Sequence, residues 1–235
     1  MKIVLIHGQG HKGITYTMSW TVLAHLMKEG DELKEVFLPQ DGPGFCIGCN
    51  SCFMKGEQHC PGADKVQPIA RAMEWADIIM LDTPNYAMDI SGAMKNLLDH
   101  LAYRWVTHRP HGSMFAKVGI VVSSSAGAPP NAALKSLSTK LKWMCVPRVY
   151  RFALISGALG IKDLSEAKKA KIESKAQKLA QKTRKAAAHP RASLRTKSAF
   201  LLFRNMQRSA SAWNPTDRNW WKTQNWLENT CPWRG

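Results

Sequence analysis

The sequence lacks any apolar run that approaches the roughly eighteen residues of a membrane-spanning helix. It also lacks the charged start, apolar stretch and small-residue cleavage site of a secretory signal. Two of its six cysteines, Cys145 and Cys231, stand apart from the other four, which is not typical of a secreted disulfide framework. We find no internal repeat. We therefore expect a cytoplasmic protein made of one large domain, or of a domain and an extension.

Acidic residues are few, with 17 Asp and Glu against 33 Lys and Arg, which gives a net charge of +16. Residues 162–208 hold fourteen of the basic residues and three of the acids, so this segment alone accounts for +11. Such a block can attract nucleic acid, an anionic membrane or an acidic redox partner. We interpret it as the solvated face of a helix and predict no nucleic-acid partner. Contact of residues 198–206 with a membrane surface is the less favoured alternative.

Strand and helix patterns alternate five times along the chain. Apolar, β-branched runs predict strands at residues 2–7, 33–39, 77–82, 117–122 and about 148–155. Apolar residues at helical spacing predict helices at 15–29, 64–75, 91–101 (capped by Ser91), 131–143 and 165–188. This alternation indicates an α/β fold, a flavodoxin-like doubly wound parallel sheet of five strands in the order 2-1-3-4-5.

The pattern breaks at His189-Pro190. We expect residues 1–188 to form the domain and residues 189–235 to form a helical, Trp-rich C-terminal extension. Five of the nine tryptophans lie in it, namely Trp213, Trp220, Trp221, Trp226 and Trp233. Tryptophans at this density seldom face water, so the extension either packs on the core or forms a subunit interface.

Three unusual loops follow predicted strands at the edge where parallel sheets bind ligands. The first, GQGHKGIT at residues 8–15, offers backbone N–H groups to a phosphate, or is glycine-rich only for close packing. The second, at 83–92, can present Tyr86 or Met88 to a planar heterocycle, or is a plain turn with Tyr86 buried. The third, SSSAG at 123–127, can wrap a ribityl chain or a pyrimidine edge, or is only a helix cap.

Four cysteines gather in residues 45–61, FCIGCNSCFMKGEQHCP. Their spacing is C-x2-C-x2-C-x7-C, with Pro61 directly after the last, and Gly48 helps the backbone to turn sharply. This spacing can direct four thiolates at one cubane iron–sulfur cluster, for which a trailing Cys-Pro is common. A structural zinc, a redox dithiol and unliganded thiols are the alternatives, and zinc sites more often use two separated C-x-x-C pairs.

These features together resemble the iron–sulfur flavoprotein and NADPH-dependent FMN reductase family of flavodoxin-fold proteins. The similarity covers residues 1 to about 160, through GQGHKGIT, the cysteine run, TPNYAMDISGAMKNLLDHL and YRWVTHRPHGSMFAKVGIVVSSSAG, with an echo in DRNWWKTQNWL. The family's first loop usually reads G-S-P-R-x-x-G-N-T. This sequence departs from it at Gln9, Gly10, His11 and Ile14, whereas Gly8, Lys12, Gly13 and Thr15 match in kind.

The resemblance implies that the chain binds FMN, with the phosphate on the first loop and the isoalloxazine ring between the second and the third. The implied FMN-binding residues are Gly8, Gln9, Gly10, His11, Lys12, Gly13, Thr15, Pro84, Asn85, Tyr86, Ala87, Met88, Ser124, Ser125, Ala126 and Gly127. It also implies that Cys46, Cys49, Cys52 and Cys60 are the ligands of a [4Fe–4S] cluster, and that NAD(P)H is a co-substrate.

We expect no catalytic side chain, because a flavin carries the electrons while the protein orients it. The expected function is an FMN-dependent oxidoreductase, a homodimer or homotetramer, that passes electrons from NAD(P)H or a reduced ferredoxin-like donor to an acceptor. The rivals are an electron carrier that serves a partner enzyme and a flavin-less basic binding protein. His108, Arg109 and His111 could polarise the flavin, but we predict that they form a surface turn held by Pro110.

Overall fold

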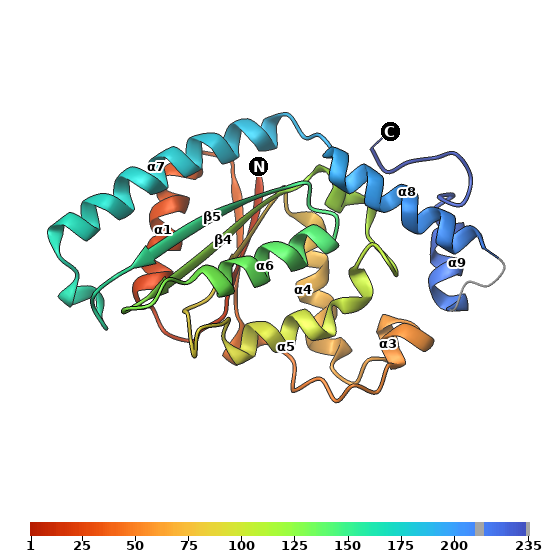
Figure 1. Cartoon of the computed structure of the whole chain (residues 1–235), viewed down its shortest axis with the longest axis horizontal. Helices are drawn as coiled ribbons and strands as arrows, with labels where there is room; N and C mark the ends of the chain where they lie inside the picture. The colour runs from red at the N-terminus through yellow and green to blue at the C-terminus, as the bar shows by residue number, and fades with distance from the viewer. Residues whose placement is uncertain (210–213, 234–235) are drawn as a thin grey trace.

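The computed structural model describes residues 1–209 and 214–233. Its centre is one sheet of five parallel strands in the order β2-β1-β3-β4-β5, which confirms the predicted flavodoxin-like fold (Figure 1). The strands are β1 (Lys2–His7), β2 (Glu32–Phe37), β3 (Ile78–Asp82), β4 (Val118–Ser125) and β5 (Arg148–Ile155). Apart from Lys2, the residues of β1 and β3 are buried, as expected of apolar strands covered on both faces.

Helices cover both faces of the sheet, because alternate residues of each strand point to opposite sides. Ile3 and Leu5 of β1 pack in one core cluster with α1 (Ile14–Leu26) and α7 (Glu166–Ala188). Val4 and Ile6 belong to the cluster on the other face. That face is covered by α4 (Ala63–Trp75), α5 (Gly92–His100) and α6 (Asn131–Trp143).

Short helical segments join the main elements. Within residues 1–209 and 214–233, two short α-helices follow β2 and four 3-10 segments lie farther along the chain. They are α2 (Leu38–Asp41), α3 (Ser51–Met54), η1 (Glu57–His59), η2 (Ala102–Arg104), η3 (Gly112–Ala116) and η4 (Ile161–Asp163). α3 and η1 both lie inside the cysteine-rich segment, so this segment is folded on itself rather than extended.

Three boundaries differ from the predicted ones by two residues or more, each for a local reason. α1 ends at Leu26 rather than at residue 29, and Gly30, with a φ of +79°, turns the chain toward β2. β2 stops at Phe37 because Pro39 lies in the first turn of α2, where its missing N–H leaves no bond unmade. β4 runs to Ser125, three residues farther than predicted, because its pairing with β5 continues that far.

The C-terminal extension is helical, as predicted, and contributes to the core on the side of α4, α5 and α6. It contains α8 (Leu194–Arg208) and α9 (Pro215–Thr223). Trp221 and Trp226 are buried and their rings contact Phe200 of α8, whereas Trp213 lies outside the described residues. In the described part of the chain, no helix combines the length and the apolar character that crossing a membrane requires.

Candidate functional site

A crevice with a cavity of about 480 Å³ opens at the carboxyl ends of the strands. Eleven of the predicted FMN-binding residues line it: Gln9, His11, Lys12, Gly13, Thr15, Pro84, Asn85, Tyr86, Ser124, Ser125 and Ala126. The other five, which do not line it, are Gly8, Gly10, Ala87, Met88 and Gly127. The three loops that the sequence singles out therefore meet at one cavity.

Gly8 serves close packing of the first loop. Its N–H donates to the carbonyl of Asp82 (2.8 Å), and its own carbonyl accepts from Ser91 Oγ (2.6 Å). A Cβ at this position would lie 2.6 Å from Ser91 Oγ and 3.0 Å from the Asp82 carbonyl oxygen. Glycine is required here because the end of β1, the end of β3 and the start of α5 approach one another too closely for a side chain.

A buried polar cluster centred on Asp82 supports the floor of the crevice. The fully buried Asp82 carboxylate accepts hydrogen bonds from His7 Nδ1 (2.7 Å), Ser19 Oγ (2.7 Å) and Gln9 Nε2 (3.0 Å). Because the amide nitrogen of Gln9 is held in this way, its Oε1 atom is left as an acceptor, buried and without a partner among the described residues. Gln9 thus offers a fixed acceptor at the wall of the crevice.

His7 bridges two carboxylates beneath the crevice. Its Nε2 atom lies 2.8 Å from Glu35 Oε1, on the opposite side of the ring from Asp82. Burial by itself lowers the pKa of His7, but the hydrogen bonds and charges of Asp82 and then Glu35 outweigh it. The pKa of His7 is therefore raised above its usual value, which favours the protonated imidazole between the two acids.

The second and third loops are joined to each other and to α1. The N–H of Asn85 donates to the Ser124 carbonyl (2.9 Å), and the hydroxyls of Ser124 and Thr15 share a hydrogen bond (2.6 Å). The Asn85 Oδ1 atom is buried without a partner among the described residues. Tyr86 lines the crevice and is half-exposed, so it is not the buried core residue of a plain turn.

Sequence reasoning missed one wall of the crevice. Ser156, Ala158, Leu159, Gly160 and Ile161, which follow β5, line it together with Ile14 and Tyr16 of α1. The available signal was the position of Gly157 and Gly160 just after a predicted strand, where the carboxyl edge of a parallel sheet places its loops.

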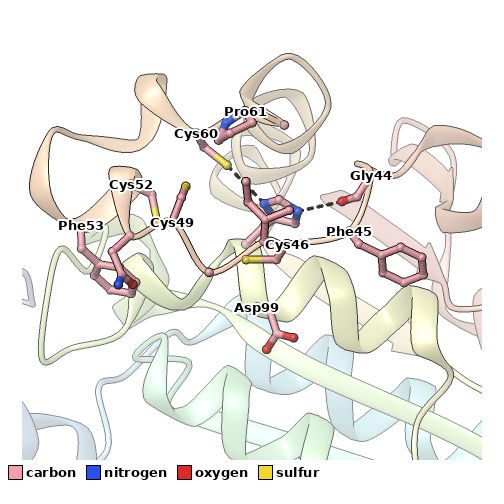
Figure 2. Close-up of a pocket in the computed structure, with 14 residues that line it drawn as sticks. Gly44, Phe45, Cys46, Cys49, Cys52, Phe53, Cys60, Pro61 and Asp99 are labelled. Atoms are coloured by element: carbon pink, nitrogen blue, oxygen red, sulfur yellow. Dashed lines mark hydrogen bonds between the residues drawn. The ribbon is translucent and has the colours of Figure 1, made fainter.

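A second cavity, of about 160 Å³, is lined by all four cysteines of the 45–61 segment (Figure 2). The segment folds around it with Cys46, Cys49, Cys52 and Cys60 on the cavity wall, and Asp99 and His100 of α5 complete the wall. The sequence predicted the thiol set but not the contribution of α5. Among the described residues, no group of three or more His, Cys, Asp or Glu side chains has the arrangement of a metal site.

α5 holds the first part of the cysteine segment. Asn96 Oδ1 accepts from the Cys46 N–H (2.9 Å), and its Nδ2 atom donates to the carbonyls of Pro43 and Gly44 (3.0 Å each). His100 Nε2 also donates to the Gly44 carbonyl (2.9 Å), and its Nδ1 atom lies 3.3 Å from Cys60 Sγ (Figure 2). One helix thus contacts both ends of the cysteine run.

The environments of the thiols differ. Burial raises the pKa of Cys52, and Cys60 and Cys46 add to this increase, whereas the Arg109 guanidinium opposes it. Cys49 is exposed, and hydrogen bonds from Ser51 lower the pKa of its thiol. Cys46 and Cys60 both lie within electrostatic range of Cys52, and this set of thiol donors suits iron or another thiophilic metal.

The prediction of a surface turn at His108, Arg109 and His111 is wrong. Arg109 and Pro110 are buried, and the two histidines are half-buried. None of them lines the crevice. Arg109 and His108 lie against the cysteine segment instead, where the Arg109 side chain reaches the carbonyls of Cys52 and Phe53 and the His108 ring contacts the Phe53 ring. His111 faces Glu74.

A five-stranded parallel sheet in this order, with polar loops around a crevice at its carboxyl edge, defines an α/β protein of the flavodoxin-like class. Residues 1–157 match the model of the family described as NADPH-dependent FMN reductase. The chain therefore belongs to that family and is a flavin oxidoreductase, as the resemblance predicted.

Two iron-sulfur flavoproteins are similar to this chain in sequence. An iron-sulfur flavoprotein of Archaeoglobus fulgidus is 32% identical over 173 residues, which cover 71% of this chain and 76% of that protein. An iron-sulfur flavoprotein of Methanocaldococcus jannaschii is 35% identical over 100 residues, 42% of this chain and 51% of that protein.

Solved structures share the fold at low identity. An azoreductase from Bacillus anthracis str. Sterne superposes with a TM-score of 0.59 at 14% identity, covering 77% of this chain and 99% of its own. An FMN-dependent NADH-azoreductase from Bacillus anthracis str. Ames Ancestor, solved in complex with FMN, gives a TM-score of 0.56 at 14% identity, covering 77% of this chain and 100% of its own.

Proposed function

We propose that the protein is an FMN-dependent oxidoreductase that binds FMN in the crevice and one [4Fe–4S] cluster in the cysteine cavity. It passes electrons from NAD(P)H, or from a reduced ferredoxin-like protein, to an acceptor. The observation that carries the proposal is the presence, in a chain of the FMN reductase family, of a second cavity lined by four cysteines. Residues 1–188 form the FMN-binding domain in this proposal, and residues 189–235 form its extension.

The crevice fits FMN because its walls offer polar atoms that lack partners within the described residues. Gln9 Oε1 and Asn85 Oδ1 are buried acceptors at its wall. His11, Lys12 and Thr15, near the start of α1, supply charge and a hydroxyl for the phosphate. The phosphate loop thus keeps donors of the required kind although its sequence departs from the family pattern.

The second loop is proposed to hold the flavin ring. Pro84, Asn85 and Tyr86 line the crevice, whereas Ala87 and Met88, with φ of +47° and +66°, form the turn that aims Tyr86. Ser124, Ser125 and Ala126 form the facing wall, whereas Gly8, Gly10 and Gly127 do not line the cavity and would act only through the shape of their loops. When bound, FMN supplies the capacity to accept a hydride and to release electrons singly.

The cysteine cavity fits an iron–sulfur cluster by the chemistry of its donors. Cys46, Cys49, Cys52 and Cys60 would be the four thiolate ligands. Four thiolates on one cluster bring net negative charge. The buried Arg109 guanidinium, although it also pairs with Asp217 and Glu57, lies next to Cys52 and opposes the rise in the pKa of its thiol.

The test is purification of the full chain without oxygen, followed by assays of iron, sulfide and flavin and by an absorption spectrum. We expect brown protein with equimolar FMN and four iron atoms per chain, the content of a [4Fe–4S] cluster. Colourless, iron-free protein after anaerobic reconstitution would refute the cluster. Iron-containing protein that binds no FMN would refute the assignment of the crevice.

We propose a homodimer or homotetramer, because large apolar side chains are exposed on the segments that form the two cavities. Phe45 is 85% exposed, Ile47 74% and Leu159 93%. Phe45 points away from the four cysteines (Figure 2). Large apolar side chains exposed to this extent are typical of interfaces. Light scattering of wild type and of Leu159→Ser tests this, and a monomeric wild type contradicts it.

We also place the protein in the cytoplasm. All six cysteines are free thiols, which suits a reducing compartment. Separation of cell extracts into cytoplasmic, membrane and extracellular fractions, followed by immunodetection, tests this. Recovery in the membrane or extracellular fraction would contradict it.

A second candidate is a non-enzymatic electron carrier that docks an acidic redox protein. It is favoured by a stripe of lysines at alternating spacings of four and three along α7, namely Lys171, Lys175, Lys178, Lys182 and Lys185. All five are exposed, and in the described part of the chain none has an acidic partner. Steady NAD(P)H oxidation with a small acceptor supports the enzyme. Reduction by a protein donor alone, weakening steeply with salt, supports the carrier.

A further inference from the structure

The helix α3, which carries Cys52, is too short to satisfy its own carbonyl groups. It spans only Ser51–Met54, so its last carbonyls need partners from outside the helix. Side chains from two distant parts of the chain supply them. The bonds run from Arg109 Nη2 to Cys52 O, from Arg109 Nη1 to Phe53 O (3.3 Å), from Asn214 Nδ2 to Phe53 O (3.1 Å) and from Thr216 Oγ1 to Met54 O (2.7 Å).

Asp217 of α9 fixes the position of the Arg109 side chain. The Asp217 carboxylate is fully buried and accepts from Arg109 Nη1 (2.6 Å) and from His108 Nδ1 (2.8 Å). Trp221 of the same helix donates through Nε1 to the His108 carbonyl (2.6 Å). Arg109 is itself buried, so removal of the Asp217 carboxylate would leave a buried positive charge without this partner and would strongly destabilise the folded protein.

Arg109 also reaches the second half of the cysteine segment. Its Nε atom lies 3.3 Å from the carboxylate of Glu57, which begins η1 three residues before Cys60. One guanidinium thus contacts the backbone at Cys52 and Phe53, the side chain of Glu57, and Asp217 of the extension. α9 and α3 lie next to each other although about 160 residues separate them in the chain (Figure 1).

From these contacts we infer that the C-terminal extension is a clasp that positions the cysteine segment. The clasp consists of Asn214, Thr216 and Asp217, with Arg109 as the group through which Asp217 acts. Its role in holding ligands for a cluster rests on the proposed function. The restraint of α3 itself depends only on the contacts given above. The Trp-rich tail therefore serves the cysteine cavity as well as the core.

Hydrogen exchange of the full-length protein tests the clasp. The N–H groups of Phe53, Met54 and Lys55 donate to the carbonyls of Asn50 and Ser51, so their exchange reports opening of α3. We expect Asp217→Asn to speed their exchange by about tenfold or more, because it weakens the hold on a buried cation. Exchange in β4, and the FMN content, should stay as in wild type. The matched control is Arg218→Gln, a change at the exposed neighbouring position on α9.

Two results would overturn the inference. One is unchanged exchange at residues 53–55 in Asp217→Asn. The other is a rise of the same size in β4 and at residues 53–55, which would mean general destabilisation. If Asp217→Asn does not fold, Thr216→Val decides, because it removes only the hydroxyl that holds the Met54 carbonyl. Faster exchange at residues 53–55 alone is then expected, and no change there contradicts the clasp.

Iron binding is measured separately on the same variants after anaerobic reconstitution. We expect Asp217→Asn to lose iron to a chelator severalfold faster than wild type. If exchange at residues 53–55 is faster in Asp217→Asn but the wild type never binds iron, the cluster is refuted and the clasp still stands. Iron bound equally well by wild type and by Asp217→Asn, with exchange unchanged, would refute the clasp and leave the cluster standing.

Discussion

The crevice and the cysteine cavity are built in different ways. Each loop of the crevice leaves the end of a strand whose place is set by the sheet, as where Asn85 follows β3 and Ser125 ends β4. The cysteine segment, by contrast, does not leave directly from the end of a strand. It is held by side chains that bond to its backbone, chiefly Asn96, His100 and Arg109. Single substitutions should therefore affect the cavity without affecting the crevice, and the reverse.

The largest expected effect is the loss of iron in Cys49→Ser, since a serine hydroxyl is a poor ligand for a cluster built on four thiolates. FMN content should stay unchanged, because the crevice is built from other loops. Iron and flavin assays of the anaerobically purified variant measure both. Cys231→Ser is the control and should retain its iron, because Cys231 lies outside the cavity. Full iron content in Cys49→Ser would count against its role as a ligand.

The reverse case is Asp82→Asn, which should weaken the crevice. Three donors face the Asp82 carboxylate, and an amide there would turn its own donor toward at least one of them. We expect a loss of about 3–5 kcal/mol in the free energy of unfolding. Urea unfolding measures it.

The matched control for Asp82→Asn lies at the cysteine cavity. Asp99 pairs with Lys95 at an exposed site, so Asp99→Asn should cost less than about 1 kcal/mol. If the two variants lost the same free energy of unfolding, the burial of Asp82 would not make its carboxylate more important to stability than that of Asp99.

A smaller effect is expected for Gly8→Ala. The added Cβ would lie 2.6 Å from Ser91 Oγ, and the Asp82 carbonyl blocks its escape on another side. Overpacking of this kind should lower the free energy of unfolding by about 1–3 kcal/mol. Gly92→Ala, one residue after Ser91, is the control, because nothing lies within 4 Å of its added Cβ. If Gly8→Ala leaves the free energy of unfolding unchanged, the first loop can move away from α5.

The same difference between the two regions explains what the sequence could predict. Apolar runs that end in glycine or in small polar residues located β1, β3 and the loops after them, and the sheet order then brought the loops together. The wall after β5 was missed because Ser156 to Ile161 carry no charge pattern or ligand motif.

The cysteine spacing predicted one thiol-lined cavity but none of its supports. His100 meets Cys60 from 40 residues away, and Arg109 meets Cys52 from 57 residues away. Such contacts follow no periodicity, because they depend on how helices pack rather than on local spacing. The tail tryptophans allowed two interpretations, and the structure finds Trp221 and Trp226 in the core.

The smallest expected effect is the pH dependence of the free energy of unfolding that arises from His7, beneath the crevice. Asp82 and Glu35 face its two ring nitrogens, Tyr16 packs against the ring, and the pKa of His7 is raised above its usual 6.5. The folded state then holds the proton more tightly than the unfolded state, so this contribution is complete below pH 6.5 and is lost as the pH rises through the folded pKa. Urea unfolding between pH 6.5 and 7.5 should show stability falling more steeply in wild type than in His7→Gln. The difference between the two profiles is the measure, because burial lowers the pKa of His111, which makes stability rise with pH as the pH approaches 6.5 in both proteins. The window ends below pH 8 because burial lowers the pKa of Lys117 to about 8, which makes stability rise with pH above that value. A difference between wild type and His7→Gln that stays constant across the window would contradict the protonated bridge between Asp82 and Glu35.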